Sequence, residues 1–143
     1  SGLSTLLLGV IAKERNLEMV SLEHLPSWAD RVREKLTRYG LTHNRVLVRP
    51  LTSYGDFEWY DTRDLDVDPI GLCICDGPPS TTYGGRKGFL YIFKDKVKKG
   101  SVILVDDVDR EDERAMVAEW EKLLSFDIDY QGSADAHAVL TVT

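Results

Sequence analysis

The fold is decided by residues 126–142, FDIDYQGSADAHAVLTV. Two strands are predicted within this stretch, Phe126–Gln131 and Ala136–Val142, and the short segment Gly132–Asp135 joins them. Parallel neighbours need a crossover of a dozen or more residues, whereas antiparallel neighbours can be joined by a tight turn. We therefore predict that the two strands form an antiparallel hairpin.

Upstream of this hairpin, predicted helices and strands alternate. Ile70–Cys75 is a continuous apolar run of the kind that a buried parallel strand makes, and Ser101–Asp106 is a second one. Helices are predicted at 3–14, 26–39, 86–97 and 110–124, and strands at 18–23, 45–51, 70–75 and 101–106. Alternation of this kind predicts an α/β fold, with a mostly parallel sheet and helices on both of its faces.

Length and charge limit what the chain can be. Its 143 residues fit one domain with a modest core. The formal net charge of −6 argues against a general nucleic-acid surface, which needs clustered Lys and Arg. The longest apolar run near the start, Leu6–Ala12, is far shorter than the roughly 20 residues that span a bilayer. We expect neither nucleic acid nor a membrane as a partner.

Two cysteines, Cys73 and Cys75, lie two residues apart in an apolar run. On a strand their side chains would share a face, which is a poor geometry for a disulfide. We predict that both are reduced and buried, and this favours a cytoplasmic protein.

The start of the chain pairs a glycine with a later acid. Gly2 opens a predicted helix, and Glu23, 21 residues later, ends the next predicted strand. A glycine turn lets a ligand approach the backbone, and an acid about 20 residues further on can accept hydrogen bonds from two ribose hydroxyls. The alternative is a plain connection and a solvated glutamate. His24 follows Glu23 and could line the same cleft.

Further acids end the two apolar strands. Asp76 follows one, and Asp106 and Asp107 end the other. If these strands are neighbours, their ends lie roughly 5 Å apart, so that two carboxylates could share a proton or hold a divalent cation such as Mg²⁺. The alternative is that Asp76 starts a turn and Asp107 caps the next helix.

Taken together, these motifs resemble class I S-adenosylmethionine-dependent methyltransferases. The opening SGLSTLLLG resembles the tail of the glycine-rich first motif of the family, and VSLEHLPSWADRVREKL resembles the second strand with its acid and the following helix. LCICDGPPS is similar to the fourth strand, and KKGSVILVDDVDREDERAMVAEW to the fifth strand and its helix. The closing hairpin separates this fold from dinucleotide-binding Rossmann domains.

The resemblance implies a Rossmann-like methyltransferase fold with strand order 3-2-1-4-5-7-6. The residues 1–143 would form a single S-adenosylmethionine-binding domain that lacks the first strand, since its counterpart would precede residue 1. A missing central strand leaves rows of unpaired backbone groups, through which the chain could associate with itself. The oligomeric state stays open.

The resemblance also implies roles for individual residues. The amino-acid end of S-adenosylmethionine would lie against the opening turn, its ribose on Glu23 near His24, and its adenine beside Leu51. Asp76 would lie near the methyl group as a base or, with Asp107, as a ligand of Mg²⁺, as in the metal-dependent sugar O-methyltransferases of the family. The acceptor would be a small molecule that is methylated on oxygen. The residues expected at the opening turn are Ser1, Gly2, Ser4 and Thr5.

Two other functions share part of this pattern. An NAD-type oxidoreductase would also use Gly2 and Glu23, although the closing hairpin and the lack of a hydride-site pair count against it. A non-catalytic domain that binds a partner through its open sheet is the other alternative. In the methyltransferase interpretation, Tyr54–Tyr60 and Thr81–Arg86 are expected to line the acceptor site.

Overall fold

The computed structural model describes residues 2–133 and 135–143, which form two compact units. Unit 1 comprises the residues up to Thr52 together with Tyr60–Asp66, and unit 2 comprises Ser53–Trp59 and Val67–Thr143. The expectation of a single domain over residues 1–143 stays a prediction.

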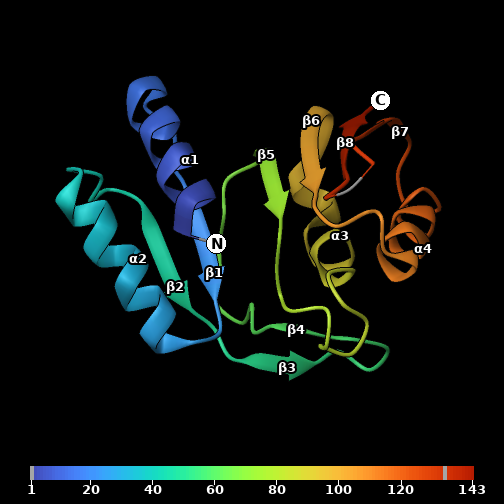
Figure 1. Cartoon of the computed structure of the whole chain (residues 1–143), viewed down its shortest axis with the longest axis horizontal. Helices are drawn as coiled ribbons and strands as arrows, with labels where there is room; N and C mark the ends of the chain where they lie inside the picture. Colours follow the sequence, from blue (N-terminus) through green and yellow to red (C-terminus); the bar gives the residue numbers. More distant parts are fainter. Residues whose placement is uncertain (1, 134) are drawn as a thin grey trace. The chain divides into compact units, whose positions relative to one another are not determined.

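Unit 1 is built on a pair of parallel strands (Figure 1). Helix α1 (Gly2–Arg15) leads to β1 (Val20–Glu23), and helix α2 (Pro26–Arg38) leads to β2 (Arg45–Val48). The register runs from Val20 opposite Arg45 to Glu23 opposite Val48, so that the carboxyl ends of both strands lie at the same edge. This is the geometry that the predicted β-α-β order requires.

The core of unit 1 lies between α2 and β2. The helix buries Ala29, Val32 and Leu36 at helical spacing, and these side chains form one cluster with Leu41 and Val46. Pro26 occupies the first turn of α2, where a missing N–H costs nothing. Gly40 then adopts a φ of 65°, a left-handed conformation that favours glycine and that ends the helix.

Unit 2 contains the larger sheet, with strand order β5-β6-β8-β7 (Figure 1). β5 and β6 are parallel, whereas β8 is antiparallel to both β6 and β7. The predicted closing hairpin is therefore confirmed, and its last strand lies between β6 and β7. The elements of this sheet are β5 (Ile70–Cys75), β6 (Val97–Val105), β7 (Phe126–Gln131) and β8 (His137–Val142).

Two helices of unit 2 contact each other, and one face of β6 is buried. Ile103 and Val105 alternate along β6 with less buried neighbours, so one face of the strand is fully enclosed. Helix α3 (Gly88–Phe93) and helix α4 (Glu111–Trp120) meet where the rings of Phe89 and Trp120 lie 6.0 Å apart. Helices on both faces of one sheet stay a prediction.

The boundaries differ from the prediction around the lysine-rich segment. A helix was expected over 86–97, but α3 ends at Phe93, a 3₁₀ turn spans Lys94–Lys96, and β6 already begins at Val97. The pattern was misleading because this part of β6 is irregular. Gly100 has a φ of 85°, and the Ser101 hydroxyl donates to the carbonyl of Ile70 over 2.7 Å in place of a regular ladder bond.

A second difference concerns residues 45–60. The strand expected over 45–51 ends at Val48, and Leu51 instead begins β3 (Leu51–Ser53), which pairs with β4 (Glu58–Tyr60). Each of these strands has only three residues, too few to show a period of two in the sequence. Within unit 2 this segment is fixed by Trp59, whose ring meets that of Phe93 edge-on at 5.8 Å.

The two cysteines are free thiols on the same face of β5, as predicted. Their sulfur atoms lie 3.6 Å apart. The prediction that both are buried is confirmed for Cys75, whereas Cys73 is only half-buried. The hydrogen bond with Cys73 and burial raise the pKa of the Cys75 thiol well above its ordinary value. Cys75 is therefore a poor nucleophile at neutral pH, and we assign it to the core.

Within residues 2–133 and 135–143, none of the helices combines the length and the apolar character that a membrane span requires.

The contact between Gly88 and Trp59 is tight enough to predict a mutational cost. A methyl group at Gly88 would overlap Cγ of the buried Trp59 and lie 2.7 Å from its Cβ. We expect Gly88→Ala to lower the free energy of unfolding by about 1–3 kcal/mol, because the indole must move in a filled core. Urea denaturation followed by circular dichroism measures this change.

The matched control is Gly71→Ala in β5, because a methyl group there meets no atom of the described residues within 4 Å. It should change the unfolding free energy by no more than about 1 kcal/mol. Equal losses for the two variants would show that the contact with Trp59 is not the cause.

Candidate functional site

The carboxyl end of β1 carries Glu23, as predicted. Its Oε1 accepts hydrogen bonds from the backbone N–H groups of His24 over 2.8 Å and of Leu25 over 3.0 Å. The side chain of His24 also lies close, with Nδ1 3.1 Å from the same oxygen. Both backbone donors reach Oε1, so neither of these two N–H groups occupies Oε2. The carboxylate is fixed at the strand end that precedes α2.

The other predicted cofactor residues of unit 1 lie on different elements. Ser1 lies outside the described residues. Gly2 and Thr5 are buried in the first turns of α1, and Ser4 is half-buried beside them. Leu51 lies at the start of β3, not at the end of the preceding strand as expected. The structure therefore places these residues in one unit, on α1, β1 and β3.

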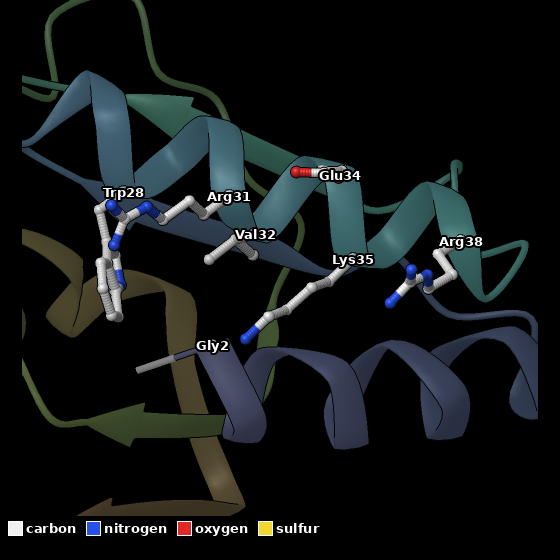
Figure 2. A pocket seen from close by; sticks show the side chains of 7 residues that line it. All are labelled: Gly2, Trp28, Arg31, Val32, Glu34, Lys35 and Arg38. Atoms are coloured by element: carbon white, nitrogen blue, oxygen red, sulfur yellow. The ribbon is translucent and has the colours of Figure 1, made fainter.

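A shallow groove of about 260 Å³ runs between the start of α1 and one face of α2 (Figure 2). Three cations of α2 line it together with a single acid. The lining residues are Gly2, Trp28, Arg31, Val32, Glu34, Lys35 and Arg38. Among the predicted site residues that the structure describes, Gly2 alone borders this groove.

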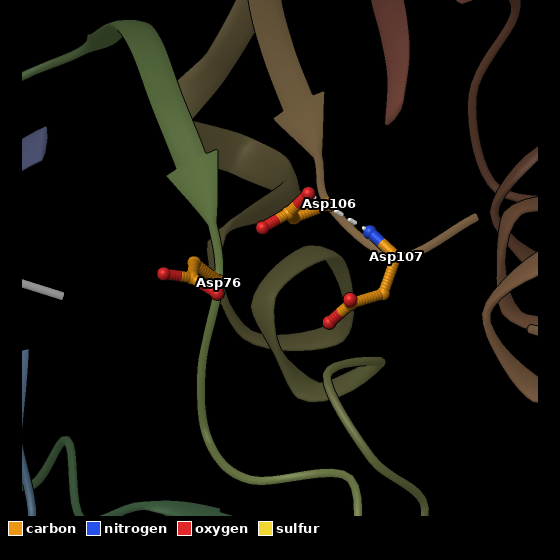
Figure 3. A group of neighbouring side chains, drawn as sticks. All are labelled: Asp76, Asp106 and Asp107. Carbon is orange, nitrogen blue, oxygen red and sulfur yellow. Dashed lines mark hydrogen bonds between the residues drawn. The ribbon is translucent and has the colours of Figure 1, made fainter. Parts of the chain in front are cut away.

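The predicted acids of unit 2 come together at the ends of β5 and β6 (Figure 3). The pairing of Cys75 with Val105 places the next residues, Asp76 and Asp106, side by side. Asp106, Asp107 and Asp76 each bring one carboxylate oxygen within 4.8 Å of the others. The juxtaposition expected from two parallel strands is therefore present.

Asp107 joins this group because its backbone is left-handed. Its φ is 62°, and its N–H donates to Oδ1 of Asp106 over 3.0 Å. In a regular strand, successive side chains point to opposite faces, and Asp107 would turn away from Asp106. The alternative role as a helix cap is wrong, since Arg110 is the N-cap residue of α4 and makes no side-chain cap bond.

The residue at the centre of this acidic group is Arg86, which the sequence analysis named only as the last residue of a segment expected to line the acceptor site. Its side chain is only 4 % exposed. One terminal nitrogen, Nη2, donates to Oδ2 of Asp107 over 2.7 Å and lies 3.7 Å from Oδ1 of Asp76. The other, Nη1, donates to the backbone carbonyl of Asp106 over 2.8 Å and lies 3.7 Å from Oε1 of Glu113.

A sequence signal for Arg86 did exist. The residue precedes Phe89 and Leu90 by three and four positions, and these residues belong to the apolar face of α3. A charged residue on the buried face of a helix is rare unless it is paired. The spacing could have predicted a buried arginine with acidic partners.

Burial and neighbouring charges shift the pKa values of Arg86 and Glu113 in opposite directions. Burial alone would lower the pKa of Arg86, but the hydrogen bond to Asp107 and the charges of Glu113, Asp107 and Asp76 outweigh it and raise that pKa. Burial raises the pKa of Glu113 above its ordinary 4.5, and the nearby Arg86 offsets this only in part. Arg86 is thus a permanent buried cation.

The acids do not fit a divalent metal while Arg86 is in place. A metal ion would need ligand oxygens at about 2.0–2.6 Å, but an N–H group of Arg86 already donates to Oδ2 of Asp107 over 2.7 Å, and Nη1 of Arg110 forms an ion pair with the same oxygen at 2.9 Å. Asp76 is the more open acid, with a side chain 31 % exposed. A carboxylate in such a position can accept a proton from a bound hydroxyl.

The two segments expected to line an acceptor site do meet. The N–H of Glu58 donates to the carbonyl of Tyr83 over 2.8 Å. Phe57 stacks on Tyr54 with ring centres 5.4 Å apart, and the Tyr91 ring of α3 lies 5.6 Å from Phe57. Tyr54, Tyr83 and Tyr91 are each more than one third exposed, so an aromatic surface is open to solvent.

Solved structures share this fold. A Staphylococcus aureus protein assigned as a caffeoyl-CoA O-methyltransferase has a TM-score of 0.63 and 10% identity, over 90% of this chain and 66% of its own. A precorrin-6y C5,15-methyltransferase from Geobacter metallireducens has a TM-score of 0.63 and 12% identity, over 90% and 68%. The Podospora anserina methyltransferase PaMTH1, solved with S-adenosylhomocysteine, has a TM-score of 0.63 and 14% identity, over 89% and 61%.

These likenesses confirm the predicted resemblance at the level of the fold. The chain has the Rossmann-like α/β fold of S-adenosylmethionine-dependent methyltransferases. It spans 66%, 68% and 61% of the length of the three structures, respectively. No protein-family model and no curated protein matches the sequence.

Glu113 generates a prediction about pH. Because its folded pKa is raised, its contribution to stability is fully present below the unfolded pKa and is lost as the pH rises through the folded pKa. Glu113→Gln mimics the protonated form at every pH. We expect the unfolding free energy of the wild type to fall relative to that of Glu113→Gln between pH 4 and pH 7, as measured by urea denaturation at each pH.

The control is Glu111→Gln, which removes the charge of an exposed acid in the same helical turn. A wild type that gains stability relative to Glu113→Gln as the pH rises would contradict the prediction, because the attraction of Arg86 would then outweigh burial.

Proposed function

We propose that this chain binds S-adenosylmethionine and transfers its methyl group to an oxygen atom of a small-molecule acceptor. The observation that carries the proposal is the strand order β5-β6-β8-β7, with acids at the carboxyl ends of β5 and β6. Ligands of open α/β sheets bind at the carboxyl ends of strands. The likeness to methyltransferases, one of them solved with S-adenosylhomocysteine, supports the same ligand.

In this proposal the residues of unit 1 hold the cofactor. Glu23 accepts hydrogen bonds from the ribose hydroxyls, and its fixed carboxylate is suited to this role because the backbone N–H groups of His24 and Leu25 already orient it. His24 and Leu51 border the ribose and adenine. The amino-acid end lies against the start of α1, at Ser1, Gly2, Ser4 and Thr5.

Asp76 of unit 2 is the proposed catalytic residue and a further cofactor contact. S-adenosylmethionine, when bound, supplies a methyl group on a positively charged sulfur. The protein has to hold the acceptor in line with that methyl group and away from water. Asp76 would orient the acceptor hydroxyl and take its proton as the oxygen bonds to the methyl carbon and the carbon–sulfur bond breaks, with S-adenosylhomocysteine as the leaving group.

The acceptor surface proposed for this reaction is the aromatic one formed by Tyr54, Phe57, Tyr83 and Tyr91. No step is assigned to Mg²⁺, because Arg86 and Arg110 already engage the carboxylate of Asp107. A cytoplasmic location and the absence of a nucleic-acid partner remain proposals from composition.

The choice between methyl transfer and NAD chemistry can be tested by ligand stabilisation. A ligand that binds only the folded state raises the free energy of unfolding by about 2.7 kcal/mol at a hundredfold excess over its Kd. We expect S-adenosylhomocysteine to raise the melting temperature of the chain and NAD at equal concentration to leave it unchanged. Stabilisation by NAD alone would refute the proposal, and stabilisation by neither would favour a non-catalytic binding domain.

Glu23 provides the sharpest test of the cofactor assignment. Each charged hydrogen bond to ribose contributes about 1.5–3 kcal/mol, so Glu23→Ala should weaken S-adenosylhomocysteine binding about tenfold or more in calorimetry. Glu23→Gln should fall between, since its amide oxygen can still accept from His24 and Leu25 but carries no charge.

Glu14→Ala, which removes an exposed acid of α1, should leave the affinity unchanged. Thermal melts of all three variants without ligand separate lost affinity from lost folding. An unchanged affinity in Glu23→Ala would show that the ribose assignment is wrong.

A further inference from the structure

Several charged side chains of both signs gather at the ends of β5 and β6. The acidic group there contains four carboxyl groups, and one buried cation lies among them with a second cation at the rim. The acids are Asp76, Asp106, Asp107 and Glu113, and the cations are Arg86 and Arg110. Carboxylates this close repel one another unless a cation lies between them.

Arg86 is fixed in this position by four groups from three different segments. Its nitrogens face the residue after β5, the two residues after β6 and one residue of α4: Asp76, Asp106, Asp107 and Glu113. Since the side chain is only 4 % exposed, it cannot swing into solvent without breaking all of these contacts. Arg110 binds the same Oδ2 of Asp107 but is 49 % exposed.

Stability alone does not account for Arg86. Its Nε is buried and has no hydrogen-bond partner among the described residues. An orphaned buried donor is unfavourable, and buried ion networks are often no more stable than apolar side chains of similar volume. We therefore attribute the presence of a cation here to the carboxylates around it, whose mutual repulsion it offsets.

Nη2 of Arg86 occupies the place that a bridging cation would need. It lies 2.7 Å from an oxygen of Asp107 and 3.7 Å from an oxygen of Asp76, the two residues that could have held a metal. A divalent ion between the same oxygens would meet the N–H groups of a guanidinium and be repelled by its charge. The guanidinium of Arg86 and a divalent ion therefore cannot occupy this position at the same time.

We propose that Arg86 is the resident cation of this acidic group, and that it holds Asp76 and Asp107 in place of a divalent metal, so that neither the fold nor methyl transfer needs a metal. The part that concerns methyl transfer rests on the proposed function. Arg86 acts there as a positioning residue, because it touches the catalytic carboxylate and does not need to touch the acceptor. Its charge cannot be removed by chelation or by dilution.

The decisive experiment titrates Mn²⁺ into the wild-type chain and into Arg86→Met, with free Mn²⁺ followed by electron paramagnetic resonance. We expect no saturable site in the wild type below about 1 mM, the weak end of protein sites for hard cations. Removing the guanidinium while keeping a side chain of similar length leaves the carboxylates without a cation. Arg86→Met should therefore bind one Mn²⁺ at least about tenfold more tightly than the wild type, and Mg²⁺ should compete for it.

Two further variants control for charge and for folding. Arg110→Met removes the cation at the rim and should behave as the wild type, because Arg86 still engages Asp107. Arg86→Lys keeps a buried cation and should fold without gaining a metal site. If Arg86→Met has no melting transition by itself, recovery of the transition on addition of Mn²⁺ is the expected result.

Three outcomes would overturn the proposal: saturable Mn²⁺ binding by the wild type below about 1 mM, a folded Arg86→Met that gains no Mn²⁺ site, or an unfolded Arg86→Met that no divalent ion restores. S-adenosylhomocysteine binding is measured on the same metal-free wild type. A wild type that binds no cofactor contradicts the proposed function, whereas the Mn²⁺ titration tests Arg86 regardless of that result.

Discussion

The arrangement of unit 2 depends on β6 being hydrogen-bonded along both edges. Val102–Val105 pair in parallel with β5 on one side and antiparallel with β8 on the other. A strand held twice cannot slip by a residue without turning its side chains to the wrong face. The loop that follows is held too, since the N–H of Val108 donates to the carbonyl of Ala136 over 2.9 Å, and this fixes where the acids after β6 can lie.

The sequence predicted the features that depend on local patterns. The apolar run before Asp76, the short joint after Gln131 and the glycine after α2 each predicted the correct element, because period and turn chemistry determine them. The acids at the strand ends were also found, since parallel neighbours bring their carboxyl ends together. The hairpin of β3 and β4 was missed, because its strands are too short to show a pattern and depend on contacts such as that between Trp59 and Phe93.

The content of the candidate site was harder to predict than its position. Arg86 is separated from Asp107 by 21 residues, so that its spacing to Phe89 and Leu90 could indicate burial, but which acids surround it follows from tertiary packing. From the sequence, two acids at neighbouring strand ends predicted a metal site. In the folded chain, the guanidinium of Arg86 lies between these acids instead. Glu23 shows the reverse case, because its place after β1 was predicted, but its two bonds to the following backbone became visible only in the structure.

The left-handed backbone of Asp107 narrows the choice of residues at that position. Only Gly, Asn and Asp adopt such a φ readily, and β-branched or bulky side chains are strained there. Of these three, only aspartate also carries the charge that both arginines contact. Residue 107 therefore has to meet two independent requirements, a left-handed backbone and a negative charge. Amino-acid substitutions should be accepted less often there than at the neighbouring Asp106, whose backbone is under no such restriction.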